Sequence, residues 1–139
     1  MPTDQELYDE LSYYTLNLSD PAFLHQEIVD AYAAQHVDDQ TKPIRTVFAL
    51  IGLYLYLEKG FTGRQVQKMH MRLASRRKRW PTIPPPNAAA AITVADALAT
   101  PPGEPRDKAI HDWCASVWET WQPHRQVIID LARNELDIR

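Results

Sequence analysis

The sequence is poor in the residues that mark disulfide frameworks and phosphate-binding loops. It has one cysteine, Cys114, and four glycines in 139 residues. A single cysteine excludes an internal disulfide framework and a metal site made of cysteines alone, so we expect a reducing, cytoplasmic compartment. So few glycines, none in a phosphate-binding motif, exclude loops of the P-loop or dinucleotide type.

The chain also has no apolar run long enough to cross a membrane. The longest run, residues 47–57, has eleven residues, whereas a transmembrane helix needs about 20. The first residues are acidic rather than basic and apolar, so we expect no secretory leader. With 45% hydrophobic residues and four tryptophans, the chain is typical of one globular domain, residues 1–139, in which residues 47–57 form a buried helix.

Charge is strongly segregated along the chain, although the net charge is only −3. Residues 1–40 contain nine acidic residues and no Lys or Arg, whereas residues 41–80 contain ten basic residues and one acidic residue. We interpret this as an acidic first third that pairs with the basic middle, either within one chain or across a homodimer. Such pairs add little stability each but favour one arrangement over others.

Helix start and stop signals predict an all-helical fold, an antiparallel helical bundle of four to five main helices. Thr3 with Glu6, and Thr62 with Gln65, have the spacing of a capping box, in which the two side chains bond each other's free backbone N–H groups. Prolines close to predicted helix starts fit the first helical turn. The predicted helices are residues 4–18, 21–36, 43–59, 62–80 and 105–136, the last interrupted at Pro123, with one short helix at 93–98.

A proline-rich segment interrupts this pattern after Trp80. Prolines at 81, 84, 85 and 86 prevent helix formation, because proline lacks the backbone N–H and clashes with the preceding turn. Residues 81–105 are therefore predicted to be an irregular connection, a strap that crosses the bundle. The earlier connections are short, which predicts antiparallel neighbours, and the helix at 43–59 is apolar nearly all round, which predicts a central position.

Three of the predicted helices each place one histidine on an apolar face: His25, His70 and His124. Neutral imidazole is a ligand for zinc, nickel or ferrous iron, and the core of a bundle is a usual place for such a site. We therefore predict a histidine-lined polar site that binds a divalent metal or a small molecule. The supporting polar residues are Asp30, Tyr32 and His36.

Each of these residues also has a purely structural interpretation. A histidine on an apolar face is often bonded to a carbonyl, a tyrosine or an aspartate, and the chain lacks the paired spacing of strong metal motifs. His36 does not share an ion with His25, because eleven helical residues separate them by about 16 Å. Asp30 is either a desolvated base or an exposed carboxylate. His111 with Cys114 is either an activated thiolate pair or a packed free cysteine.

Basic residues follow one side of the predicted helix at 62–80. Lys68, Arg72, Arg76 and Arg79 are spaced like a stripe that tracks phosphates. A solvated or acid-paired helix end is the favoured interpretation, since the helix dipole favours cations there. Nucleic-acid binding is thus the third function considered, after the histidine-lined site and a non-catalytic homodimer, and the residues indicate no particular reaction.

Four short motifs carry a resemblance. They are His25-Gln26-x-x-Val29-Asp30-Ala31-Tyr32-Ala33-x-Gln35-His36, Gly52-Leu53-Tyr54-Leu55-x-Leu57-Glu58-x-Gly60, Trp80-Pro81 with Pro84-Pro85, and Thr93-Val94-Ala95-Asp96. Together they resemble a family of small bacterial proteins of unknown function over most of residues 23–121, which implies no activity. A looser likeness is to helical bundles of the DinB type, which implies a three-histidine metal site. The sequence departs from that pattern, because no single helix carries their pair of histidines.

Overall fold

The computed structural model describes residues 1–139 and contains helices but no strands. This confirms the all-helical prediction, although the elements are more numerous than the four to five main helices expected. They are α1 (Asp4–Leu16), α2 (His25–Gln35), α3 (Pro43–Glu58), α4 (Gly63–Ser75), α5 (Val94–Ala99), α6 (Glu104–Thr120), the 3₁₀ turn η1 (Gln122–His124) and α7 (Arg125–Leu136).

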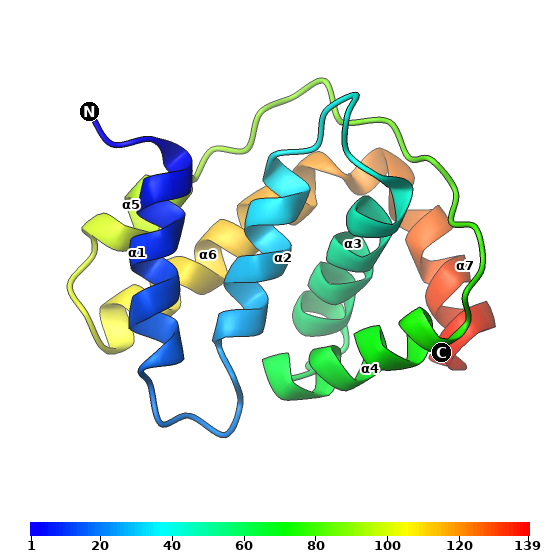
Figure 1. Ribbon diagram of the computed structural model, residues 1–139, viewed down its shortest axis with the longest axis horizontal. Helices are drawn as coiled ribbons and strands as arrows, with labels where there is room; N and C mark the ends of the chain where they lie inside the picture. The colour runs from blue at the N-terminus through cyan, green and yellow to red at the C-terminus, as the bar shows by residue number, and fades with distance from the viewer.

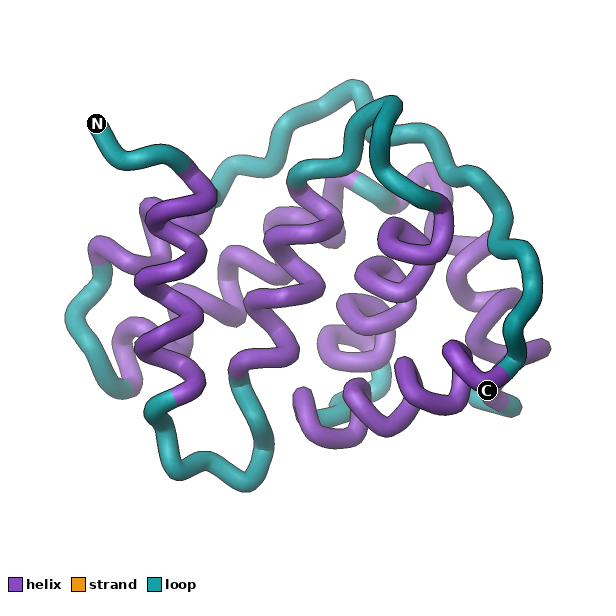
Figure 2. The backbone as a smooth tube through the Cα atoms, viewed as in Figure 1, coloured by secondary structure: helices purple, strands orange, loops and turns teal.

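The first three helices form an antiparallel layer with α2 in the middle (Figure 1). α6 passes behind this layer and packs against α2 and α3, while α7 flanks α3. α4 runs across the ends of α2 and α3 rather than alongside them, so the expected antiparallel order holds only as far as α3. The proline-rich connection after α4 passes around the bundle to α5 beside α1, which confirms the predicted strap (Figure 2).

α3 lies at the centre, as its apolar sequence predicts. Its buried residues extend around most of the helix, and Val47, Leu50 and Leu53 are completely buried. On α6 the fully buried Trp113 donates its indole N–H to Gln35 Oε1 over 2.8 Å, so this large side chain is buried without an unpaired donor. No helix of the protein is long and apolar enough to cross a bilayer.

Capping signals located most helix starts correctly, but the start of α2 differs from the prediction. Both expected capping boxes are present, at Thr3 and at Thr62. α2, however, begins at His25 rather than at Pro21. Phe23 has a φ of 59°, and Asp20 Oδ2 accepts the backbone N–H of Leu24 over 2.7 Å. The carboxylate therefore closes a turn before the helix instead of capping its first turn.

The end of α4 also differs from the prediction, because the helix stops at Ser75 and not near Trp80. Arg77 has a φ of 51°, a left-handed conformation that no helix can contain. The turn brings the buried Trp80 against Phe48, with ring centroids 5.4 Å apart in an edge-to-face arrangement. The packing of Trp80 against Phe48 outweighs the helix propensity of the basic residues 76–79, which separate the end of α4 from Trp80.

Glu58, at the end of α3, ties three helices together. Its carboxylate accepts the indole N–H of Trp118 on α6 over 2.7 Å and two N–H groups of Arg125 on α7, one of them over 2.9 Å. The hydrogen bond from Arg125 is the main cause that lowers the pKa of Glu58. The pair thus holds a charged carboxylate at the junction of α3, α6 and α7.

Glu58→Gln is expected to lower the free energy of unfolding by about 1 kcal/mol, because the neutral amide keeps only part of these charge-assisted bonds and solvent screens the partly exposed pair. Urea unfolding followed by circular dichroism measures the change. Glu119→Gln, at an exposed position of α6, is the matched control, with an expected effect within about 0.5 kcal/mol. Equal effects of the two substitutions would contradict this role of Glu58.

Candidate functional site

The candidate site is built around a carboxyl group buried between α2 and α3. Asp30 is only 4% exposed, and its Oδ1 accepts an N–H of Gln26 over 3.2 Å. Its Oδ2 lies against Gly52 of α3, where an added Cβ atom would be 2.0 Å from that oxygen. Only glycine leaves this space free. Burial raises the pKa of Asp30 well above its ordinary value, because a buried site disfavours the charged carboxylate.

His70 of α4 joins this carboxyl through Gln26. His70 Nε2 lies 2.7 Å from the backbone oxygen of Phe48. Because a carbonyl only accepts, Nε2 carries the proton and Nδ1 is left as an acceptor. Gln26 Nε2 lies 3.4 Å from that Nδ1, so its two N–H groups reach His70 and Asp30. Burial lowers the pKa of His70, so it disfavours the charged forms of both His70 and Asp30.

These polar groups line a cavity of about 380 Å³ among α1, α2, α3 and α4. Apolar side chains form much of the remaining wall. Arg45, which is exposed, is the only Lys or Arg among the lining residues. The lining residues are Tyr8, Gln26, Val29, Asp30, Ala33, Ile44, Arg45, Phe48, Ala49 and His70.

Tyr32 and His36, predicted to support the site, pack elsewhere on α2. The Tyr32 ring stacks between Tyr8, with centroids 4.2 Å apart, and His36, with centroids 4.0 Å apart. His36 Nε2 lies 3.2 Å from Asp4 Oδ2 at the start of α1. Neither Tyr32 nor His36 lines the cavity around Asp30. They hold α2 against α1 instead.

The structure does not bring His25, His70 and His124 together. His25 Nδ1 lies 2.9 Å from Thr15 Oγ1, while His124 ends η1 with its ring 6.1 Å from that of Trp121. No three His, Cys, Asp or Glu side chains are grouped so as to hold a metal ion. His25 and His70 each have a hydrogen-bond partner within the protein, as the structural interpretation expects. Metal binding by the three histidines stays a prediction, and no cluster of ligands supports it.

The basic residues at the end of α4 are tied to α7. Arg76 donates to the backbone oxygen of Glu135 over 2.7 Å, and Lys78 pairs with the Glu135 carboxylate. Lys68, Arg72 and Arg79 are exposed. The acid-paired helix end is therefore present in part, and nucleic-acid binding through Lys68, Arg72, Arg76 and Arg79 stays a prediction.

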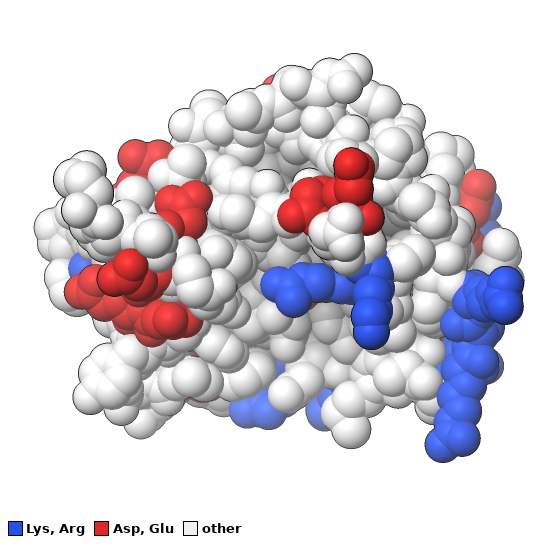
Figure 3. All heavy atoms as spheres, turned by 45° about the horizontal axis from the view of Figure 1, so that its top comes forward, with Lys and Arg blue, Asp and Glu red and all other residues white.

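The acidic and basic thirds of the sequence do not pair within the chain. No Lys or Arg of residues 41–80 forms an ion pair with an acid of residues 1–40. Acidic side chains gather on the α1 side of the face in Figure 3 and basic ones toward α4 and α7, with one mixed group between them. Pairing of these regions across a homodimer stays a prediction.

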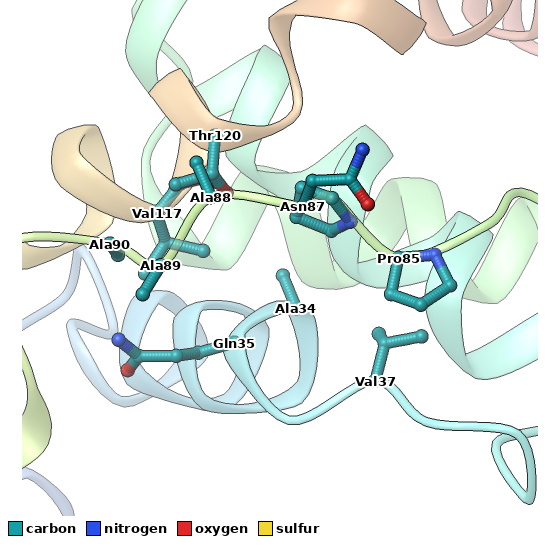
Figure 4. A pocket seen from close by; sticks show the side chains of 11 residues that line it. Ala34, Gln35, Val37, Pro85, Asn87, Ala88, Ala89, Ala90, Val117 and Thr120 are labelled. Carbon is teal, nitrogen blue, oxygen red and sulfur yellow. The ribbon is translucent and has the colours of Figure 1, made fainter.

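A separate groove of about 270 Å³ lies beneath the strap, between the end of α2 and the end of α6 (Figure 4). Alanines and prolines of residues 85–90 cover it, and Ala34, Val37 and Val117 form its floor. Its lining contains no acid, base or thiol. The groove therefore lacks the groups capable of proton transfer that line the cavity around Asp30.

Sequence reasoning did not select Gln26, Arg45, Gly52 or Glu27 as site residues. Gly52 had a usable signal, since a glycine inside an apolar helix indicates a close approach of another group. Glu27 had none, because its burial arises from packing around α2, which α1, α3, α4 and α6 enclose. His111 bonds Tyr56, and Cys114 is buried against the Glu27 carbonyl, so the packed-cysteine interpretation fits the structure.

Comparisons with known proteins place the chain in a family without indicating an activity. No curated protein and no solved structure matches it, and the likeness to DinB-type bundles therefore has no support. A family model, described as a family of unknown function (DUF5946), matches residues 3–122. The match confirms the resemblance to a family of unknown function. The chain belongs to the DUF5946 family.

Proposed function

We propose that the protein binds a small organic acid, as its anion, in the cavity around Asp30. One observation carries the proposal: a buried carboxyl group, whose pKa burial raises, lines a cavity whose only Lys or Arg is Arg45. Natural cores rarely bury a carboxyl at this depth. Here the fold gives up a side chain at Gly52 to accommodate it, which favours a functional role.

The chemistry of the lining selects an anion with an apolar body. Arg45 offers a planar cation that bonds a carboxylate through two N–H groups. Val29, Ile44 and Phe48 provide apolar wall, and a cavity of this size suits a small ligand. A cationic ligand is disfavoured, because it would face the guanidinium beside a carboxyl whose charged form burial disfavours.

Asp30 then acts as a hydrogen-bond donor toward a second oxygen of the ligand. A protonated carboxyl donates one O–H, whereas the ionised form only accepts. Gln26 occupies Oδ1 as a donor, which leaves the proton of the acid on Oδ2. Gln26 also occupies Nδ1 of His70, so His70 orients the amide rather than contacting the ligand.

Short straight-chain carboxylates are expected to bind and raise the thermal midpoint, whereas the matched primary amides are not. Isothermal titration calorimetry measures the affinity. Arg45→Ala is expected to weaken carboxylate binding at least about tenfold, since it removes a charge-assisted bidentate contact. Arg72→Ala, at an exposed position outside the cavity, should leave the affinity unchanged. Absence of carboxylate binding, or equal weakening by both substitutions, would contradict the proposal.

A further inference from the structure

A second and larger cavity lies on another side of α2, toward α6. Its volume is about 550 Å³. The turn before α2, the first turn of α2, the end of α3, the connection from α3 to α4 and the start of α6 all contribute to its wall. None of its lining residues is shared with the cavity around Asp30.

Glu27 is the buried polar group of this cavity. The residue is 3% exposed, lines the cavity, and its Oε1 has no hydrogen-bond partner. An unpaired buried carboxyl oxygen is costly, and native structures retain few of them. The neighbouring Cys114 thiol bonds the backbone oxygen of Glu27 rather than its side chain. One oxygen of the Glu27 carboxyl thus has no hydrogen-bond partner within the protein.

Acidic side chains are the only full charges that line this cavity besides Glu27. Asp20 and Asp107 line it, and no Lys or Arg does. Asp107 accepts the hydroxyl of Tyr14 over 3.0 Å, and Tyr56 lies 3.3 Å from His111 Nδ1. The titratable groups that face Glu27 across the cavity are Asp20 before α2, Tyr56 of α3, and Asp107 and His111 of α6.

From the unpaired Glu27 oxygen, the two further carboxyl groups of Asp20 and Asp107 and the absence of Lys and Arg from the lining, we infer that the cavity binds a small organic cation, an alkylammonium ion. An ammonium group donates three hydrogen bonds and carries the charge that the carboxyls attract. Phe61 and Tyr56 offer aromatic rings to the cation and to its alkyl chain. A metal ion fits less well, because no three His, Cys, Asp or Glu side chains are grouped to hold one.

Binding of the cation couples to a proton. Burial, and to a lesser extent the charge of Asp20, raises the pKa of Glu27 to about 9. Glu27 is therefore protonated in the empty cavity at neutral pH. An ammonium ion beside it favours the ionised form, so the Glu27 carboxyl loses its proton to the buffer when the cation binds.

Calorimetry with 1-butylammonium, and with 1-butanol as the matched neutral compound, tests the inference near pH 7.5. The cation is expected to bind and the alcohol not. The observed enthalpy should change with the ionisation enthalpy of the buffer, with a slope corresponding to release of about one proton. Glu27→Gln is expected to weaken binding at least about tenfold and to remove the buffer dependence, whereas Glu10→Gln, exposed on α1, should change neither.

Equal binding of the alcohol, absence of binding by the cation, or binding without proton release would each overturn the inference. Should Glu27→Gln fail to fold, the buffer dependence of the unaltered protein alone decides the outcome. The organic-acid site around Asp30 is tested separately, since Arg45→Ala should not alter cation binding. The two proposals therefore fail independently.

Discussion

Gly52→Ala is expected to lower the free energy of unfolding by about 3 kcal/mol, the upper end of what overpacking usually costs. The new Cβ would lie 2.0 Å from Asp30 Oδ2 and 2.6 Å from its Cγ. The carboxyl cannot move away easily, because it is buried between α2 and α3 and bonded to Gln26. Helix propensity alone would favour alanine by about 1 kcal/mol, so the predicted sign is opposite to that of an ordinary helical glycine.

A double-mutant cycle with Asp30→Ala isolates the contact. In the Asp30→Ala background the carboxyl is gone, and Gly52→Ala should become neutral or stabilising, with a coupling of at least about 2 kcal/mol. Gly60→Ala is the matched control. Gly60 has a φ of +70° and nothing near its Cβ position, so its cost of about 1 kcal/mol should not depend on Asp30. A stabilising effect of Gly52→Ala in the unaltered protein would contradict the packing described above.

The free energy of unfolding is expected to fall by about 3 kcal/mol as the pH rises from 6.5 to about 9, the window between the ordinary histidine pKa and the raised pKa of Glu27. Glu27 is protonated when folded and ionised when unfolded in this window. The folded state therefore binds more protons, and raising the pH favours unfolding. Asp30, whose pKa burial also raises, adds a change of the same sign.

Below pH 6.5 the two histidines oppose this trend. Burial lowers the pKa values of His25 and His70, so the unfolded state binds their protons more readily, whereas Glu27 and Asp30 still bind more protons in the folded state. Because these contributions offset each other, the pH dependence of stability is expected to be weaker below 6.5 than above it.

Urea unfolding over a series of pH values measures the dependence. Glu27→Gln should reduce the slope above pH 6.5 by the equivalent of one proton and make the protein more stable at high pH, because the buried amide need not ionise. Glu10→Gln, exposed on α1, should leave the slope unchanged. A stability that is constant or rising across the same window would contradict the burial of a neutral Glu27.

The sequence predicted the features that depend on neighbours along the chain. Both capping boxes, at Thr3 and at Thr62, open helices, because the pattern acts within four residues. The strap followed from its prolines, and the central position of α3 from its apolar faces. The predicted start of α2 was wrong because an aspartate such as Asp20 either caps a helix or closes a turn. In the structure it closes the turn through Phe23.

The site was less predictable, because it depends on how helices meet. The periodicity of a helix gives the face on which His25 or His124 lies, but not the depth and angle at which that face meets another helix. The three histidines consequently lie on core-facing surfaces that point to different neighbours. For Asp30 the sequence left open a desolvated base or an exposed carboxylate. The structure buries it, and its contact with Gly52 depends on the register between α2 and α3.

The protonation state of Asp30 is the most direct test. The ¹³C chemical shift of its carboxyl carbon, measured by NMR during a pH titration, reports this state. The resonance is assigned by its absence in Asp30→Asn. The carboxyl is predicted to keep its proton to a pH well above that at which an ordinary aspartate ionises, because the buried pocket against Gly52 disfavours its charge. Ionisation with an ordinary aspartate pKa of about 4 would contradict the account.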